Sequence, residues 1–180
     1  MIAEETLVKE LKQKDTQAKA FEVLISIYKE RLYWHIRRIV LDHDDADDVL
    51  QNTFIKVFRN IDTFKGDSKL YSWMYRIGTN EALTFLKTKS RKLGVSSDEL
   101  IERKANTLEA DVYFEGDAIQ LQLQQAIARL PEKQKLVFNM KYFEELKYEE
   151  ISKILDTSVG ALKASYHLAV KKIEGFLENN

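Results

Sequence analysis

The stretch KYEEISKILDTSVGALKASYHLAVKK, residues 147–172, decides the fold of the C-terminal part of the chain. Apolar residues recur at helical spacing on both sides of the polar turn 156–158, and the second pattern continues to Leu177. The apolar positions are Tyr148, Ile151, Ile154 and Leu155 before the turn, and Leu162, Ala169, Val170, Ile173 and Phe176 after it. This spacing predicts two helices joined by a tight turn, a helix-turn-helix.

The second of these predicted helices has the features of a DNA-reading helix. In a helix-turn-helix, the N-terminal residues of the second helix contact base edges in the major groove. No Asp or Glu occurs between Ser158 and Ile173, which favours DNA over the alternative, a helical hairpin within a bundle. Candidates for base contacts are Lys163, Ser165, Tyr166 and His167, and candidates for phosphate contacts are Lys171 and Lys172.

Helical patterns also fill the segments before the turn. Apolar residues at three- and four-residue steps predict one helix over 21–40. A second begins after the acids Asp44, Asp45, Asp47 and Asp48, whose carboxylates suit an N-cap, and continues to Phe58. Further towards the C-terminus, a pattern resumes at Ile119, and Pro131 suits the first turn of the helix that follows. One Pro and six Gly in 180 residues favour an all-α fold.

A third N-terminal helix, over about 69–89, carries a polar and mostly cationic stripe. The loop 62–68 precedes it, where Gly66 permits a turn and Ser68 can act as the N-cap. The stripe follows steps of three and four residues and consists of Arg76, Asn80, Thr84, Lys87 and Arg91. Aromatic and basic residues interleave just before it, at Phe64, Lys65, Lys69, Tyr71, Trp73 and Tyr75. Cations that track phosphates beside rings that stack on bases are typical of single-strand binding, although a solvated basic face over a core of rings has the same pattern.

The segment between the two helical halves differs in composition. From Val95 to Asp117 there are seven acids and two bases, a net charge of -5, with few apolar residues. We therefore expect an acidic linker over 93–117 between two small helical domains.

Composition argues against several classes of protein. Lys and Arg total 28 against 29 Asp and Glu, so the chain is not a uniformly basic nucleic-acid coat. The absence of Cys excludes disulfides and thiolate metal sites, and the acids of 42–48 lack the pattern of a calcium loop. With no phosphate-binding Gly-rich loop or nucleophile elbow, we expect no enzymatic activity, no metal and no cofactor. The N-terminus lacks the features of a signal peptide and no long apolar run is present, so we expect a cytoplasmic protein without membrane insertion.

Three segments together resemble a known family. They are DADDVLQNTFIKVFRN at 45–60, IDTFKGDSKLYSWMYRIGTNEAL at 61–83, and LPEKQKLVFNMKYFEELKYEEISKILDTSVGALKASYHLAVKKI at 130–173. From about Ala18 onward, the chain resembles the extracytoplasmic-function (ECF) sigma factors of bacterial RNA polymerase, which belong to the sigma-70 family. The KASYH stretch at 163–167 also resembles the subset of this group found in Bacteroidetes-type bacteria.

The resemblance implies a non-enzymatic factor that binds core RNA polymerase, directs it to promoters and helps to melt promoter DNA. It implies a region 2 domain at 18–92 and a region 4 domain at 118–178. The implied partners are the clamp and flap regions of core polymerase, promoter DNA and an anti-sigma factor. Contacts to the clamp fall on Asp48, Gln51, Asn52, Phe54 and Lys56. Contacts to the melted strand of the −10 element fall on Phe64, Lys65, Lys69, Tyr75, Arg76, Asn80, Thr84 and Lys87. Contacts to the −35 element fall on Lys163, Ser165, Tyr166, His167 and Lys171.

The last helix departs from the family pattern, which has several Arg where this chain has Ser165, Leu168 and Val170. Because bidentate Arg to guanine is the commonest major-groove contact, the family's promoter preferences do not transfer to this chain. Two alternatives stay open: a stand-alone helix-turn-helix regulator, and a helical adaptor that binds only proteins.

Overall fold

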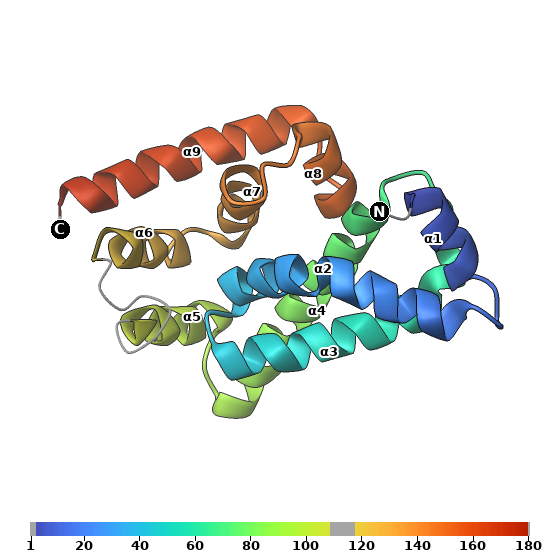
Figure 1. Cartoon of the computed structure of the whole chain (residues 1–180). Helices are drawn as coiled ribbons and strands as arrows, with labels where there is room; N and C mark the ends of the chain where they lie inside the picture. The colour runs from blue at the N-terminus through green and yellow to red at the C-terminus, as the bar shows by residue number, and fades with distance from the viewer. Residues whose placement is uncertain (1–2, 109–117, 180) are drawn as a thin grey trace.

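The computed structural model describes residues 3–108 and 118–179, and these residues form helices and connecting turns without a β-strand. The N-terminal half contains α1 (Glu4–Leu11), α2 (Gln17–Val40), α3 (His43–Asn60), the short 3-10 helix η1 (Ile61–Thr63), α4 (Leu70–Leu93) and α5 (Ser97–Asn106). The C-terminal half contains α6 (Ala118–Ala128), α7 (Glu132–Tyr142), α8 (Tyr148–Leu155) and α9 (Val159–Glu178) (Figure 1). The predicted all-α fold is confirmed.

Helices α2, α3 and α4 pack against one another and form the core of the N-terminal half, with α1 against α2. Leu24, Ile36 and Val57 are fully buried between them. Gly78 allows α4 to approach α2 closely, because a Cβ there would lie 3.2 Å from the Leu32 Cδ1. The predicted apolar stripe of 21–40 therefore faces two helices.

The starts of α3 and α4 are stabilised in different ways. A carboxylate caps α3 as predicted, since the Asp42 side chain accepts a hydrogen bond of 2.9 Å from the Asp45 N–H. The predicted start of this helix, after Asp48, is wrong, because α3 begins at His43 and the acids that follow lie in its first turns. The prediction that Ser68 caps α4 is wrong, because the N-cap is Lys69 and has no side-chain cap. Instead, the Glu4 carboxylate of α1 accepts from the Leu70 N–H at 2.9 Å. This contact joins residues 66 positions apart, beyond the reach of local sequence patterns.

Part of the segment that we expected to be a linker is helix α5. The Ser96 hydroxyl caps it by accepting from the Glu99 N–H at 3.0 Å, and Leu100 and Ile101 are buried. Lys104 then anchors α5 to α3 through the Asp45 carboxylate, at 2.6 Å. The high density of acids conceals this apolar pair in the sequence. Residues 109–117 of the expected linker lie outside the described residues.

The C-terminal half contains the predicted helix-turn-helix, formed by α8 and α9. Asp156 ends α8 in the left-handed conformation, with φ 51°, and the Ser158 hydroxyl accepts from the Ala161 N–H at the start of α9. Pro131 is the N-cap of α7, one residue before the position that we predicted. A small core of Ile127, Phe138 and neighbouring residues joins α6, α7 and α9.

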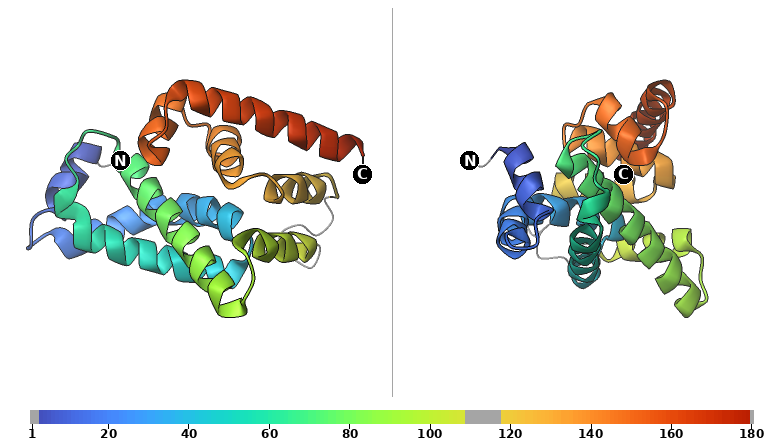
Figure 2. Two further views of the ribbon diagram at one scale, coloured as in Figure 1. Left: turned by 180° about the vertical axis from the view of Figure 1, so that it is seen from behind. Right: turned by 90° about the vertical axis from the view of Figure 1, so that its right-hand side faces the viewer.

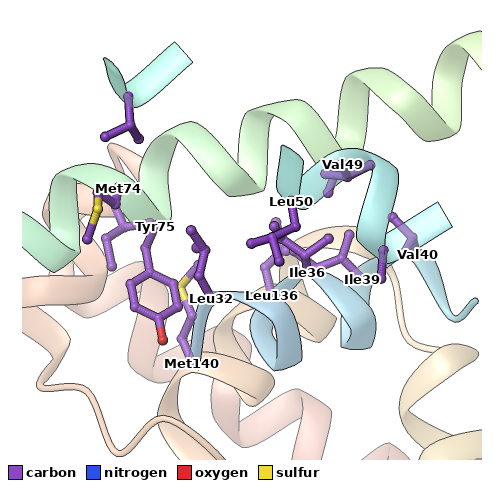
Figure 3. Packing of buried hydrophobic residues seen from close by; sticks show 14 of the residues in the cluster. Leu32, Ile36, Ile39, Val40, Val49, Leu50, Met74, Tyr75, Leu136 and Met140 are labelled. Carbon is purple, nitrogen blue, oxygen red and sulfur yellow. The ribbon is translucent and has the colours of Figure 1, made fainter. Parts of the chain in front are cut away.

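The two halves pack against each other rather than lying apart. Helix α8 lies against α4, and α7 lies against α2 (Figure 2). One buried cluster includes Leu32 and Tyr75 of the first half with Leu136 and Met140 of the second (Figure 3). The chain therefore buries its two halves in a common core.

The interface between the two halves contains a buried charged residue, Lys135 of α7, whose burial is unfavourable. Its side chain lines a cavity of about 380 Å³ between α4, α5 and α7, and the residue is 7% exposed. Burial lowers the pKa of Lys135 to about 8, against the opposing effect of the nearby carboxylates of Asp98, Glu132 and Glu102. The ammonium group is thus charged at neutral pH but poorly solvated.

We predict that Lys135→Met raises the free energy of unfolding by about 3 kcal/mol at pH 7, since the pKa of Lys135 falls from its ordinary 10.5 to about 8 on folding and one pKa unit corresponds to about 1.4 kcal/mol. Urea unfolding measures this. The gain over wild type should shrink above pH 8, because the unfolded chain then holds more protons at Lys135 than the folded chain and wild-type stability rises. The control Lys133→Met, at an exposed position of the same helix, should leave stability nearly unchanged. Equal or lower stability of Lys135→Met would contradict the assignment of a buried charge.

Candidate nucleic-acid interface

The predicted cationic stripe lies on one exposed face of α4. Arg76, Asn80, Thr84 and Lys87 are all exposed, and their spacing aligns them along the helix. Arg91 extends the stripe by one more turn. This face of α4 can therefore follow an extended chain of phosphates.

The aromatic residues predicted beside this stripe have a different placement. Phe64 is 4% exposed and Tyr75 is 2% exposed, so both belong to the core in this structure. The Phe64 ring packs on Trp73, with ring centroids 5.5 Å apart, and the Lys12 Nζ lies over it. Lys65 is exposed beside Gly66, which has a φ of 81°. The rings stabilise the loop between η1 and α4, and Lys65 projects from it.

Two of the predicted strand-binding residues contact carboxylates from the C-terminal half. The Tyr75 hydroxyl donates to the Glu144 carboxylate at 2.8 Å, and the Lys69 ammonium lies 3.0 Å from that of Glu150. Burial, followed by the charge of Glu144, raises the pKa of Tyr75, so its hydroxyl stays protonated. Burial alone would raise the pKa of Glu150, but hydrogen bonds from Tyr71, the Lys147 N–H and Lys69 lower it to about 2. Both carboxyl groups thus face donors of the N-terminal half.

His35 is a buried residue of α2 that contacts α4. It is 1% exposed, and its Nε2 lies 2.8 Å from the Thr79 hydroxyl. Burial, with the positive charges of Arg38 and Arg31, lowers its pKa to about 3. His35 is therefore a neutral structural residue.

The five residues predicted on α9 separate into two groups. Lys163, His167 and Lys171 are exposed and follow steps of four residues along one face. Tyr166 is half-buried and stacks on Phe138, with centroids 5.7 Å apart and planes at 13°. Ser165 is also half-buried. Fewer of the predicted α9 residues are therefore exposed than the sequence suggested.

Ser165 lines a cavity of about 230 Å³ together with Arg76 and Asn80 of α4. The cavity lies between α4 and the helix-turn-helix, and its other polar lining includes Asp156 and Thr157 at the turn. The structure therefore brings the predicted strand-binding stripe to the N-terminal part of α9, a proximity that the sequence did not indicate.

The α3 residues that we predicted as binding residues include both exposed side chains and side chains that pack or pair within the protein. Asp48, Gln51 and Asn52 are exposed. Phe54 is 8% exposed and packs edge-on against Phe21, and Lys56 pairs with Glu81 of α4. Two apolar residues of this helix are exposed, Ile55, which was not among the predicted residues, and Phe58, which was expected on the apolar side of the helix. The exposure of Ile55 could have been predicted from the sequence, because Ile55 falls on the same side of the helix as Gln51 and Asn52 rather than on the buried stripe.

The described residues give two further findings. Within residues 3–108 and 118–179, no three His, Asp or Glu side chains converge in a way that could hold a metal ion. None of the helices in these ranges is long and apolar enough to cross a membrane.

Comparisons with known proteins agree with this geometry. The family model for Sigma-70 region 2 matches residues 24–92, and that for Sigma-70, region 4 matches residues 120–173. The ECF RNA polymerase sigma factor SigW of Bacillus subtilis is 33% identical over 170 residues, 89% of each chain. The ECF RNA polymerase sigma-E factor of Escherichia coli K12 is 30% identical over 181 residues, 96% of this chain and 93% of its own.

Two solved structures share the fold. CnrH, in complex with the cytosolic domain of CnrY, has a TM-score of 0.71 at 19% identity and covers 99% of both chains. The sigma factor RpoE, in complex with the anti-sigma factor NepR from Bartonella quintana, has a TM-score of 0.70 at 18% identity, over 89% of this chain and 98% of that one. These relatives do not bear on the Bacteroidetes-like subset, which stays a prediction.

We predict that Tyr166→Ala lowers the free energy of unfolding by about 2 kcal/mol, because it removes a half-buried ring stacked on Phe138. Denaturant unfolding measures this. His167→Ala, at the exposed neighbouring position, should change stability by less than about 0.5 kcal/mol. If Tyr166→Ala were as stable as His167→Ala, the ring would not be a packing residue.

Proposed function

Because the chain belongs to the ECF group of sigma-70 factors, which direct RNA polymerase to specific promoters to initiate transcription, we propose roles for the surfaces described above. In this proposal, residues 18–92 are the region 2 domain and residues 118–178 are the region 4 domain. Residues 93–117 connect them, partly through α5. The observation that carries the proposal is the exposed polar stripe of α4, aligned beside the loop that precedes this helix.

The stripe of α4 captures the melted strand of the −10 element. Arg76 and Lys87 supply positive charge, and Asn80 supplies an amide that can bond to a base edge. Extruding a base from the duplex costs a few kcal/mol of stacking, which contacts to Lys65 and the loop offset. The predicted contacts of Phe64, Lys69 and Tyr75 require a rearrangement, because these residues are buried or ion-paired in this structure.

The exposed face of α9 reads the −35 element. Lys163 and His167 lie where base edges are contacted in a helix-turn-helix, and Lys171 lies one turn further, near the phosphates. Ser165 and Tyr166 contribute indirectly, since Tyr166 fixes the orientation of α9 against α7. With few cations on this helix, duplex binding is weak without polymerase.

The exposed face of α3 binds the polymerase clamp. Asp48, Gln51 and Asn52 form its polar part and Ile55 its apolar centre, whereas Phe54 and Lys56 hold the helix in place through Phe21 and Glu81. Apolar side chains within a polar rim are typical of protein interfaces. The region 4 domain binds the flap, and the protein acts in the cytoplasm, where the polymerase is found.

An anti-sigma factor is a further proposed partner. The similar structure of RpoE is a complex with the anti-sigma factor NepR. The match extends over 89% of this chain and includes both helical halves, which supports the same kind of partner here.

We predict that Arg76→Ala and Asn80→Ala each reduce promoter opening about tenfold and change core polymerase binding less than twofold, because α3 is intact in both variants. Permanganate reactivity of the −10 element measures opening, and a competition assay measures core binding. Arg103→Ala, at an exposed Arg of α5, is the matched control and should open promoters like wild type. Equal losses in opening and core binding would overturn the assignment of the stripe.

A further inference from the structure

A carboxylate of the C-terminal half is buried within a basic pocket of the N-terminal half. The Glu144 side chain, in the connection between α7 and α8, is 5% exposed. Its oxygens lie 3.2 Å from the Arg31 Nε and 2.8 Å from the Arg38 Nη1, and they also accept from the Tyr75 hydroxyl at 2.8 Å. Arg31 donates a second bond to the Glu144 carbonyl. Every one of these donors comes from α2 or α4.

A second carboxylate covers the start of α4. Glu150, in the first turn of α8, accepts from the Tyr71 hydroxyl and pairs with Lys69 at 3.0 Å. One turn later, Lys153 donates to the Asp67 carbonyl at 2.9 Å. Through these contacts, helix α8 binds the start of α4 and the loop before it, which are the segments that we assign to strand capture.

The pocket that receives these carboxylates has the chemistry of a phosphate and base site. The Arg31 guanidinium lies over the rings of Tyr71 and Tyr75, at 5.2 and 5.7 Å from their centroids. Arginines that bind oxyanions beside aromatic rings are typical of single-strand binding sites. A carboxylate and a phosphate group are both oxyanions that accept hydrogen bonds from Arg, so the same donors suit either group.

The interface between the halves also contains two buried polar side chains. The Asn139 side chain is buried, and neither of its polar atoms has a hydrogen-bond partner among the described residues. Lys135 is buried nearby on the same helix without an ion pair in the described part of the chain. A buried amide without a hydrogen-bond partner and a buried ammonium group are both unfavourable. Separation of the halves would hydrate Asn139 and Lys135, so the bonds of Glu144 and Glu150 act together with the apolar packing to hold the closed state.

We propose that Glu144 and Glu150 form an inhibitory latch that occupies a strand-binding pocket, and that Arg31 and Arg38 bind the phosphates of single-stranded DNA once the latch opens. This inference rests on the proposed function, because it assigns new residues to strand capture. It explains why Lys69 and Tyr75 are engaged internally in this structure. The free factor is closed, and separation of its halves on the polymerase uncovers the pocket.

The test uses the full chain with the double substitution Glu144→Gln and Glu150→Gln. The matched control is Glu145→Gln with Glu149→Gln, which changes the net charge equally at exposed neighbouring positions. The probe is a fluorescent single-stranded DNA of about twelve nucleotides, and fluorescence anisotropy without polymerase measures its affinity. We expect the latch variant to bind about tenfold more tightly than the control, with a larger radius of gyration in X-ray scattering.

A third variant tests the pocket itself. Adding Arg31→Ala and Arg38→Ala to the latch variant should abolish the gain in affinity while the radius of gyration stays large. A gain that is absent, that appears equally in the control, or that survives loss of both arginines would overturn the proposal. If circular dichroism shows that the double latch variant is unfolded, Glu150→Gln alone should give a gain of about threefold, and no gain would overturn the proposal.

Run-off transcription with core polymerase separates this proposal from the proposed function. A wild-type chain that gives no promoter-specific transcript overturns the proposed function. Normal wild-type transcription without the expected gain in strand binding overturns only the latch.

Discussion

The burial of the Glu144 carboxylate between Arg31, Arg38 and Tyr75 is the constraint on which the arrangement of the two halves depends. A carboxylate that leaves water must recover the lost solvation from donors, and breaking such a site by removing one partner is strongly destabilising. Here the donors come from two helices of one half and the carboxylate from the other. The site therefore aligns the halves in one register, which the apolar packing of Leu136 and Met140 alone would not specify.

This register has a consequence for DNA recognition. It places Ser165, in the N-terminal part of α9, on the cavity that Arg76 and Asn80 of α4 also line. It also engages Lys69 and Tyr75 internally. If the proposed DNA-binding roles hold, a factor in this state offers DNA the outer faces of α4 and α9 but not the full proposed strand-binding pocket. The near-zero net charge of the chain also disfavours DNA binding by the free factor, because the attraction of such a chain to phosphates is weak.

Local patterns predicted α2, α4 and the helix-turn-helix, because capping and periodicity act within a few residues, but they did not indicate α1. The turn at 156–158 was predicted correctly on this basis, and so was a carboxylate cap for α3, although the start of α3 was placed after Asp48 instead of at His43. Helix α5 was missed because its charged outer face hid Leu100 and Ile101. The Glu144 site could not have been predicted from spacing, since its partners lie 69 to 113 residues away. Which residues of the predicted site are buried likewise depends on packing between the halves, as for Tyr75.

The distance between the two halves, measured with and without core polymerase, tests the account most directly. The chain has no Cys, so Lys19→Cys on α2 and Lys172→Cys on α9 provide two exposed positions for spin labels. Pulsed electron paramagnetic resonance should give one narrow distance distribution for the free factor and a clearly different one for the polymerase complex. The same distance distribution in both states would contradict the account, because the latch would then remain closed during transcription initiation.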